Sequence, residues 1–129
     1  MDKKEIRYGI VGIGKQGTLY TKIFTKLSGL VKGAKLTAVC DILPERRKYA
    51  EENLKGVKVF DNYHDMFASG LIDVVMVETP HYFHPQIAID AMKARLNVLC
   101  DKPASVYTKQ VREMKKKKKK HPELLFGMM

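Results

Sequence analysis

The sequence predicts an α/β fold, a doubly wound parallel sheet with helices on both faces, formed by residues 1–129 as a single domain. Three observations carry this prediction. Short apolar runs alternate with helical segments along the whole chain. The run 72–79, IDVVMVET, is apolar almost throughout, as in a strand buried on both faces of a parallel sheet. A glycine-rich turn follows the first apolar run and opens a helix.

The first half of the chain supplies three strands and three helices. Residues 6–12 form a strand that ends in glycine, and a helix begins near Gly14. The apolar residues of this helix recur at three- and four-residue steps: Leu19, Ile23, Leu27 and Leu30. A second strand covers 34–41, and a helix over 44–54 opens with proline followed by an acid. The strand 57–60 and the short helix 64–70, closed by glycine, follow.

The second half continues the same alternation. After the strand 72–79 comes a helix over 82–95, with an apolar face formed by Ile87, Ala88, Ala91 and Met92. The segments 96–101, 105–120 and 124–129 predict a fifth strand, a fifth helix and a sixth strand. The order expected for six such strands is 3-2-1-4-5-6.

Composition excludes several classes of protein. Hydrophobic residues make up 45% of the chain, as in a soluble globular domain, and no apolar run is long enough to span a bilayer. The N-terminus enters a strand pattern without the apolar core of a signal peptide, which favours a cytoplasmic protein. Cys40 and Cys100 are too few for a disulfide framework, and each ends an apolar run, so both are expected to be buried, inert thiols. The expected strand order also separates them.

The net charge of +10 comes largely from one segment. Six of the 24 basic residues form the uninterrupted run 115–120, and the rest of the chain has 18 basic against 14 acidic residues. The expected role of this run is a solvated helix end, and a polyanion-binding patch or an altered stretch remain as alternatives. Nucleic acid is therefore not the expected partner.

The glycine-rich turn predicts a dinucleotide site. Gly12, Gly14 and Gly17 form G-x-G-x-x-G after the first strand. Asp41 ends the second strand, 24 residues after Gly17. The residues expected to cradle a pyrophosphate are Gly12, Ile13, Gly14, Lys15, Gln16 and Gly17. Asp41 is expected to accept hydrogen bonds from the ribose hydroxyls and to repel a 2′-phosphate, which favours NAD over NADP. The alternative is a structural turn, with Asp41 capping the helix at Pro44.

Two arginines complicate the choice of cofactor. A nearby arginine can receive the 2′-phosphate of NADP, and Arg46 and Arg47 follow Asp41 in the chain. Both fall in the next helix, so neither is expected directly beside Asp41.

The ends of the fourth and fifth strands should form the other side of the same crevice. Thr79, Pro80 and His81 follow the fourth strand, and Asp101 and Lys102 follow the fifth. His81 and His84 have a spacing that suits a metal, but the turn offers few further ligands, so no metal is predicted. His84 is expected either to bond the backbone at a helix start or to contact the cofactor or substrate.

Four segments together resemble one protein family. YGIVGIGKQG, CD, ETPHYFHP and above all CDKPAS are similar to the N-terminal NAD(P)-binding Rossmann domain of the glucose–fructose oxidoreductase/inositol dehydrogenase (Gfo/Idh/MocA) family. The resemblance implies that Lys102 lies by the nicotinamide and the substrate hydroxyl, as the catalytic residue. It implies that Asp101, where the family has Glu, contacts the nicotinamide ribose, and that His84 contacts the cofactor or substrate. Pro103 would restrict Lys102 to an extended backbone.

The resemblance sets the expected function. The chain would be the NAD-binding half of an oxidoreductase that transfers a hydride between NAD and a secondary alcohol of a sugar or polyol. Family members continue into a larger substrate domain that carries a second catalytic group, so this chain is expected to be an N-terminal piece, homo-oligomeric when full length. A sensor that binds the dinucleotide without turnover is the alternative function.

Overall fold

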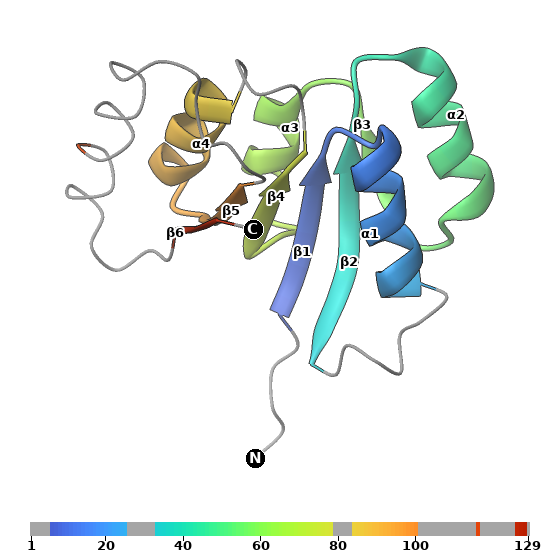
Figure 1. Ribbon diagram of the computed structural model, residues 1–129, viewed down its shortest axis with the longest axis horizontal. Coiled ribbons are helices and arrows are strands. Elements are labelled where there is room, and N and C mark those ends of the chain that lie inside the picture. The colour runs from blue at the N-terminus through green and yellow to red at the C-terminus, as the bar shows by residue number, and fades with distance from the viewer. Residues whose placement is uncertain (1–5, 26–32, 79–83, 101–115, 117–125, 129) are drawn as a thin grey trace.

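The computed structural model describes residues 6–25, 33–78, 84–100, 116 and 126–128. Within these ranges strands and helices alternate as the sequence predicts (Figure 1). The strands are β1 Ile6–Val11, β2 Ala34–Cys40, β3 Lys58–Phe60, β4 Val74–Val77, β5 Asn97–Cys100 and β6 Phe126–Met128. The helices are α1 Lys15–Thr25, α2 Pro44–Asn53, α3 Tyr63–Ala68 and α4 His84–Lys93.

The strands form one parallel sheet in the order β3-β2-β1-β4-β5-β6, which confirms the predicted order. The register brings the strand ends level: Val11 pairs with Cys40 on one side and with Val77 on the other, and Val77 pairs with Cys100. The carboxyl ends of β1, β2, β4 and β5 therefore meet at one edge of the sheet, where ligands bind in open α/β sheets.

Helices cover both faces of the sheet, with α1 and α2 on one face and α3 and α4 on the other (Figure 1). Successive strand residues point to opposite faces. Ile10 and Met76 accordingly belong to the core under α1 and α2, whereas Val11 and Val77 belong to the core under α3 and α4. The predicted apolar face of α4 is confirmed, because its members are all buried: Ile87, Ala88, Ala91 and Met92.

The predicted apolar face of α1 is wrong at Leu19, which is 50% exposed, whereas Thr21 is fully buried. The reason is that α1 packs on the turn through Gly17. Thr21 lies one turn later on the same side of the helix, whereas Leu19 lies on the opposite side. Leu27 and Leu30 lie outside the described residues. So does the predicted helix 105–120 apart from Lys116, which is helical and exposed.

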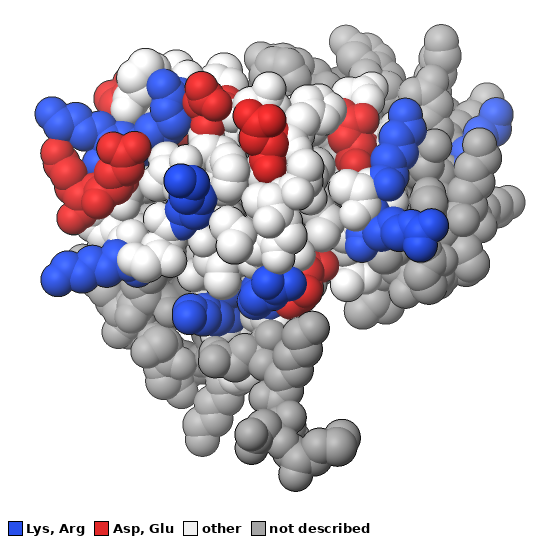
Figure 2. Space-filling view, turned by 180° about the vertical axis from the view of Figure 1, so that it is seen from behind, with Lys and Arg blue, Asp and Glu red and all other residues white. Residues whose placement is uncertain are grey.

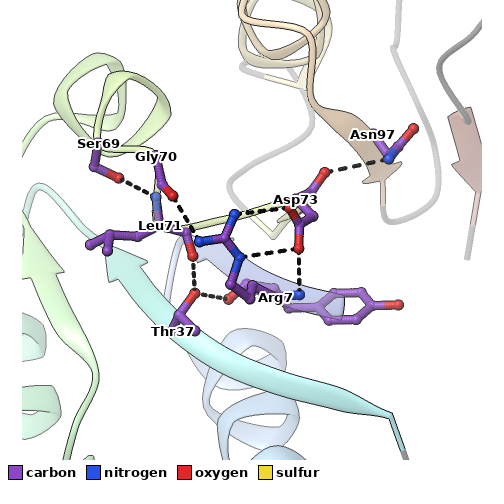
Figure 3. Close-up of polar contacts among 8 residues, drawn as sticks. Arg7, Thr37, Ser69, Gly70, Leu71, Asp73 and Asn97 are labelled. Carbon is purple, nitrogen blue, oxygen red and sulfur yellow. Dashed lines mark hydrogen bonds and ion pairs between the residues drawn. The ribbon is translucent and has the colours of Figure 1, made fainter. Parts of the chain in front are cut away.

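A polar cluster joins the elements at the opposite edge of the sheet (Figure 3). The Arg7 guanidinium donates to both carboxylate oxygens of Asp73, at 3.2 Å from Nε and 3.0 Å from Nη2, and to the Gly70 carbonyl at 2.8 Å. The backbones of Arg7 and Asp73 are also bonded, and Asn97 donates its amide to the Asp73 carbonyl. The cluster thus ties β1 to the start of β4 and to β5.

Charges of both signs are interspersed on the face shown in Figure 2. None of the helices in the described ranges is both long and apolar enough to cross a lipid bilayer.

Candidate functional site

The glycine turn after β1 has the geometry that Gly12 and Gly17 predict. Gly12 has a φ of 93°, a conformation that side chains disfavour, and its amide donates to the Cys40 carbonyl at 2.8 Å. A Cβ on Gly17 would lie 1.9 Å from the Gly12 carbonyl oxygen, so only glycine allows α1 to pack on its turn. Thr18 steadies the turn further, because its hydroxyl donates to the Ile13 carbonyl at 2.9 Å.

Asp41 ties the end of β2 to this turn. Its Oδ2 accepts from the Ile13 amide at 2.9 Å, and its Oδ1 accepts from the Leu43 amide at 2.9 Å. The residue is only 5% exposed. The alternative that Asp41 caps the helix at Pro44 is wrong, because the N-cap of α2 is Leu43 and no side chain makes a capping hydrogen bond. Ile13 itself is buried and its amide is engaged by Asp41, so its contribution is to fix the turn.

The expectation that neither arginine lies beside Asp41 is wrong for Arg46. Its Nη1 is 3.4 Å from the Asp41 Oδ2, with the Arg46 side chain 43% exposed. The reason is the short connection: α2 begins three residues after Asp41, so its first turn can return a side chain to the tip of β2. Arg47 instead donates to the carbonyls of Asp41 and Ile42, at 3.0 Å and 2.9 Å.

A cleft of about 730 Å³ opens beside the turn at the carboxyl edge of the sheet. It contains residues from the ends of β1, β2 and β4 together with the starts of α2, α3 and α4. The lining residues are Val11, Gly12, Cys40, Asp41, Ile42, Leu43, Arg46, Asp61, Asn62, Tyr63, His64, Glu78, Gln86 and Ile87. The volume and the mainly apolar walls suit a small organic ligand with a few polar contacts.

Polar side chains on α3 and α4 close one wall of the cleft. Asp90 accepts from the Tyr63 hydroxyl and from the Gln86 amide, the latter at 2.9 Å, and His64 Nε2 lies 3.8 Å from it. Burial, followed by the hydrogen bond to Asp90, raises the pKa of Tyr63 above its ordinary value. The phenol therefore stays a neutral donor, and its bond holds α3 against α4.

Cys40 is a free, buried thiol that lines the cleft. Burial raises its pKa to about 12, with a smaller contribution from the charge of Asp41. The expectation that Cys40 is buried is confirmed. A thiol with a raised pKa stays protonated at neutral pH, where it is a poor nucleophile.

Several predicted site residues lie outside the described residues: Thr79, Pro80, His81, Asp101 and Lys102. Lys15 and Gln16 are the first residues of α1, and His84 is the first residue of α4. Among the described residues no three His, Cys, Asp or Glu side chains gather closely enough to hold a metal ion.

The sequence did not predict that Tyr63 and His64 line the cleft, and it misplaced Arg46, which was not expected beside Asp41. For Arg46 a signal was available, because an arginine five residues after the strand-ending acid falls in the first turn of the next helix. For Tyr63 and His64 the sequence contains no such signal, because their place in the cleft depends on how α3 crosses the sheet.

Comparison with known proteins matches this geometry to one family. The model of the oxidoreductase family with an NAD-binding Rossmann fold (Gfo/Idh/MocA) matches residues 6–127. Inositol 2-dehydrogenase of Corynebacterium glutamicum (strain R) is 30% identical over 100 residues, which cover 78% of this chain and 29% of that protein.

Solved structures agree. Myo-inositol 2-dehydrogenase from Lactobacillus plantarum superposes with a TM-score of 0.86 at 34% identity, covering 98% of this chain and 36% of that one. Scyllo-inositol dehydrogenase from Lactobacillus casei, with bound NAD(H) and scyllo-inositol, gives a TM-score of 0.87 at 31% identity and covers 97% and 36% of the two chains. The chain therefore spans about a third of the length of these relatives.

Proposed function

Because this chain belongs to the oxidoreductase family with an NAD-binding Rossmann fold, we propose that it binds NAD for hydride transfer to or from a secondary alcohol of a sugar or polyol. The names of the relatives support the polyol class, since they are inositol dehydrogenases, and one was solved with NAD(H) and scyllo-inositol. The activity proposed is that of a whole enzyme of which this chain supplies the dinucleotide site.

The described residues fit a dinucleotide. The atoms nearest to a Cβ on Gly14 would belong to the flexible Arg46 side chain, which can move aside for a pyrophosphate. The first amides of α1 and its positive dipole end favour an anion there. The carboxylate of Asp41 suits a ribose diol and disfavours a 2′-phosphate, which supports NAD over NADP. The observation that carries the proposal is this coupling of a buried acid to the glycine turn.

The roles of the chain's own residues follow from this arrangement. The turn would hold the pyrophosphate, and Asp41 would orient the adenosine ribose. Thr79, Pro80, His81 and His84 would form the wall on the β4 side, and Asp101 would contact the second ribose. Lys102 would hold the reacting oxygen and take its proton during oxidation. The cofactor, when bound, supplies the hydride chemistry.

Calorimetric titration with NAD and NADP tests the cofactor assignment. We expect NAD to bind in roughly the 10 μM to 1 mM range and NADP to bind more weakly. Asp41→Ser should narrow this difference by weakening NAD and admitting the 2′-phosphate, and Asp41→Asn, which keeps the shape, should act in the same direction. A folded wild-type sample that binds neither cofactor, or that prefers NADP, would contradict the proposal.

Lys102 is tested in the complete enzyme with an inositol as substrate. Lys102→Ala should lower kcat by roughly 10²–10⁴-fold, the usual worth of acid–base assistance, while the Kd for NAD changes little. Lys48→Ala serves as the control, because Lys48 is exposed on α2 and pairs only weakly, at 4.0 Å, with Glu52. A Lys102→Ala enzyme with more than half of the wild-type kcat would remove Lys102 from the chemistry.

A further inference from the structure

We propose that Glu78 makes the cofactor site discriminate between the oxidised and the reduced dinucleotide, by placing a buried negative charge on the nicotinamide side of the site. The inference rests on the proposed function, because it concerns which form of NAD the site holds more tightly. NAD⁺ carries a positive charge on its nicotinamide ring and NADH does not. A carboxylate near the ring therefore favours NAD⁺ over NADH.

Glu78 is the first residue after β4 and is fixed against the end of β1. Its amide donates to the Val11 carbonyl at 2.8 Å, which holds its backbone next to the glycine turn. Val77 belongs to the core under α3 and α4, so the Glu78 side chain is on the opposite face of the sheet, toward α1. A Cβ on Gly17 would accordingly lie 3.7 Å from the Glu78 Cβ. Glu78 also belongs to the lining of the cleft.

The strand order indicates which part of the dinucleotide reaches this position. A dinucleotide crosses a doubly wound sheet where the strand order reverses, here between β1 and β4. With the adenosine ribose at Asp41 after β2 and the pyrophosphate at the turn after β1, the nicotinamide half continues toward the end of β4. Of the acids that directly follow a strand in the described ranges, Asp41 and Asp61 follow β2 and β3, and Glu78 follows β4. Glu78 is thus the acid on the nicotinamide side.

The surroundings of Glu78 strengthen the effect of its charge. Both of its carboxylate oxygens are buried. A charge in a region of low dielectric constant acts on neighbouring charges more strongly than a charge in water does. The side chain lies beside Gly17 in the first turn of α1, and the positive dipole end of that helix favours an ionised carboxylate. This carboxylate repels the pyrophosphate of NAD⁺ and of NADH alike, so the charge of the ring separates the two forms.

The experiment measures the dissociation constants of NAD⁺ and NADH for the complete enzyme, without substrate and at one ionic strength. Glu78→Gln keeps the size of the side chain and removes its charge. In this variant we expect the ratio of the Kd for NADH to the Kd for NAD⁺ to fall about 5- to 30-fold. ADP-ribose contains the pyrophosphate but no nicotinamide, so its affinity should change by the same factor as that of NADH.

Asp61→Asn is the matched control. Asp61 also belongs to the lining of the cleft, but it is exposed and follows β3, which is three strands away from β4. Neighbouring strands are spaced so that this separation is roughly 14 Å, beyond the distance at which exposed charges act in physiological salt. The ratio of the two dissociation constants should therefore change less than about twofold in Asp61→Asn.

Two further variants cover the case in which Glu78→Gln folds poorly. Glu78→Ala removes the charge without burying an amide and should lower the ratio as Glu78→Gln does. Glu78→Asp keeps the charge and should keep the ratio within about threefold of the wild-type value. An unchanged ratio in a folded neutral variant, or an equal fall in Glu78→Asp, would overturn the role of Glu78 and leave the proposed function standing. A folded wild-type enzyme that binds neither NAD⁺ nor NADH would overturn both.

Discussion

At the scale of single residues, the site depends on two positions at which nothing else fits. The positive φ of Gly12 and the 1.9 Å approach of a Cβ on Gly17 to the Gly12 carbonyl both concern backbone atoms, which cannot move aside as a side chain can. Gly14 differs, because its nearest neighbour is the flexible end of Arg46. The three glycine positions of one motif thus differ in how well they tolerate a side chain.

Gly17→Ala and Gly14→Ala form a matched pair that tests this difference. We expect Gly17→Ala to lower the free energy of unfolding by at least about 2 kcal/mol, in the upper range for forcing an extra methyl into a packed site. Gly14→Ala should leave stability nearly unchanged and instead weaken ADP-ribose binding, because the methyl occupies the expected pyrophosphate position. Urea denaturation and calorimetry measure the two effects, and equal stability losses in both variants would refute the assignment.

The buried thiol gives a second test at this scale. In a Cys100→Ser background, Cys40 should resist iodoacetamide at pH 8 in the folded protein, because its pKa is raised to about 12 and it is buried. The same sample in urea should be alkylated rapidly. Mass spectrometry of the two reactions measures the difference, and rapid labelling of the folded protein would show that Cys40 is accessible.

At the scale of elements, the two edges of the sheet have different roles. The carboxyl edge carries the glycine turn and the cleft, whereas the opposite edge carries the Arg7–Asp73 cluster (Figure 3). Asp73 accepts the Arg7 amide at 2.9 Å as well as the guanidinium, so one carboxylate satisfies both the backbone and the side chain of β1. This arrangement aligns β1 and β4, and with them the tips that form the site.

Asp73→Ala should therefore lower the melting temperature by roughly 3–8 °C. It removes the acceptor of the Arg7 amide and leaves the guanidinium with the Gly70 carbonyl alone. Glu52→Ala is the comparison, because it breaks only the exposed Lys48–Glu52 pair, and such surface pairs contribute little. Differential scanning calorimetry of both variants decides the matter. If the two melting temperatures were equal, the cluster would have no special stabilising role.

At the scale of the whole molecule, the buried thiol of Cys40 and the partly buried phenol of Tyr63 link stability to alkaline pH. Burial raises the pKa of Cys40 to about 12, and burial with the Asp90 hydrogen bond raises that of Tyr63. In the unfolded chain a thiol ionises near 8.5 and a phenol near 10. Above these values the unfolded chain holds fewer protons than the folded protein, so stability falls as the pH rises. Below about pH 8 neither group affects the pH dependence.

The free energy of unfolding should thus decrease between pH 9 and 11, with Cys40 contributing up to about 1 kcal/mol per pH unit, less where solvent screens it. Cys40→Ala and Tyr63→Phe should each flatten this slope, and the double variant should flatten it most. Urea titrations at several pH values measure the slopes. A slope that is the same in all four proteins would exclude both groups as its cause.

The local pattern of the chain determined the elements and their order. A few residues are enough to distinguish the apolar spacing of a strand from that of a helix. Parallel strands joined by right-handed crossovers can be placed in only a few orders within a sheet. The segments 6–12, 34–41 and 72–79 therefore predicted β1, β2 and β4, and the order 3-2-1-4-5-6 followed. The glycine spacing predicted the turn after β1, because Gly12 and Gly17 answer to backbone requirements within that same turn.

Only the tertiary structure decided which side chains meet across elements. Arg46 lies on Asp41 and Gly14 because of how α2 returns from the tip of β2. Leu19 is exposed because Gly17, two residues earlier on the opposite side of α1, packs against the turn. Tyr63 meets Asp90 because α3 packs beside α4. Such contacts depend on the rotation and distance of packed elements, which arise from the whole core rather than from any short stretch of sequence.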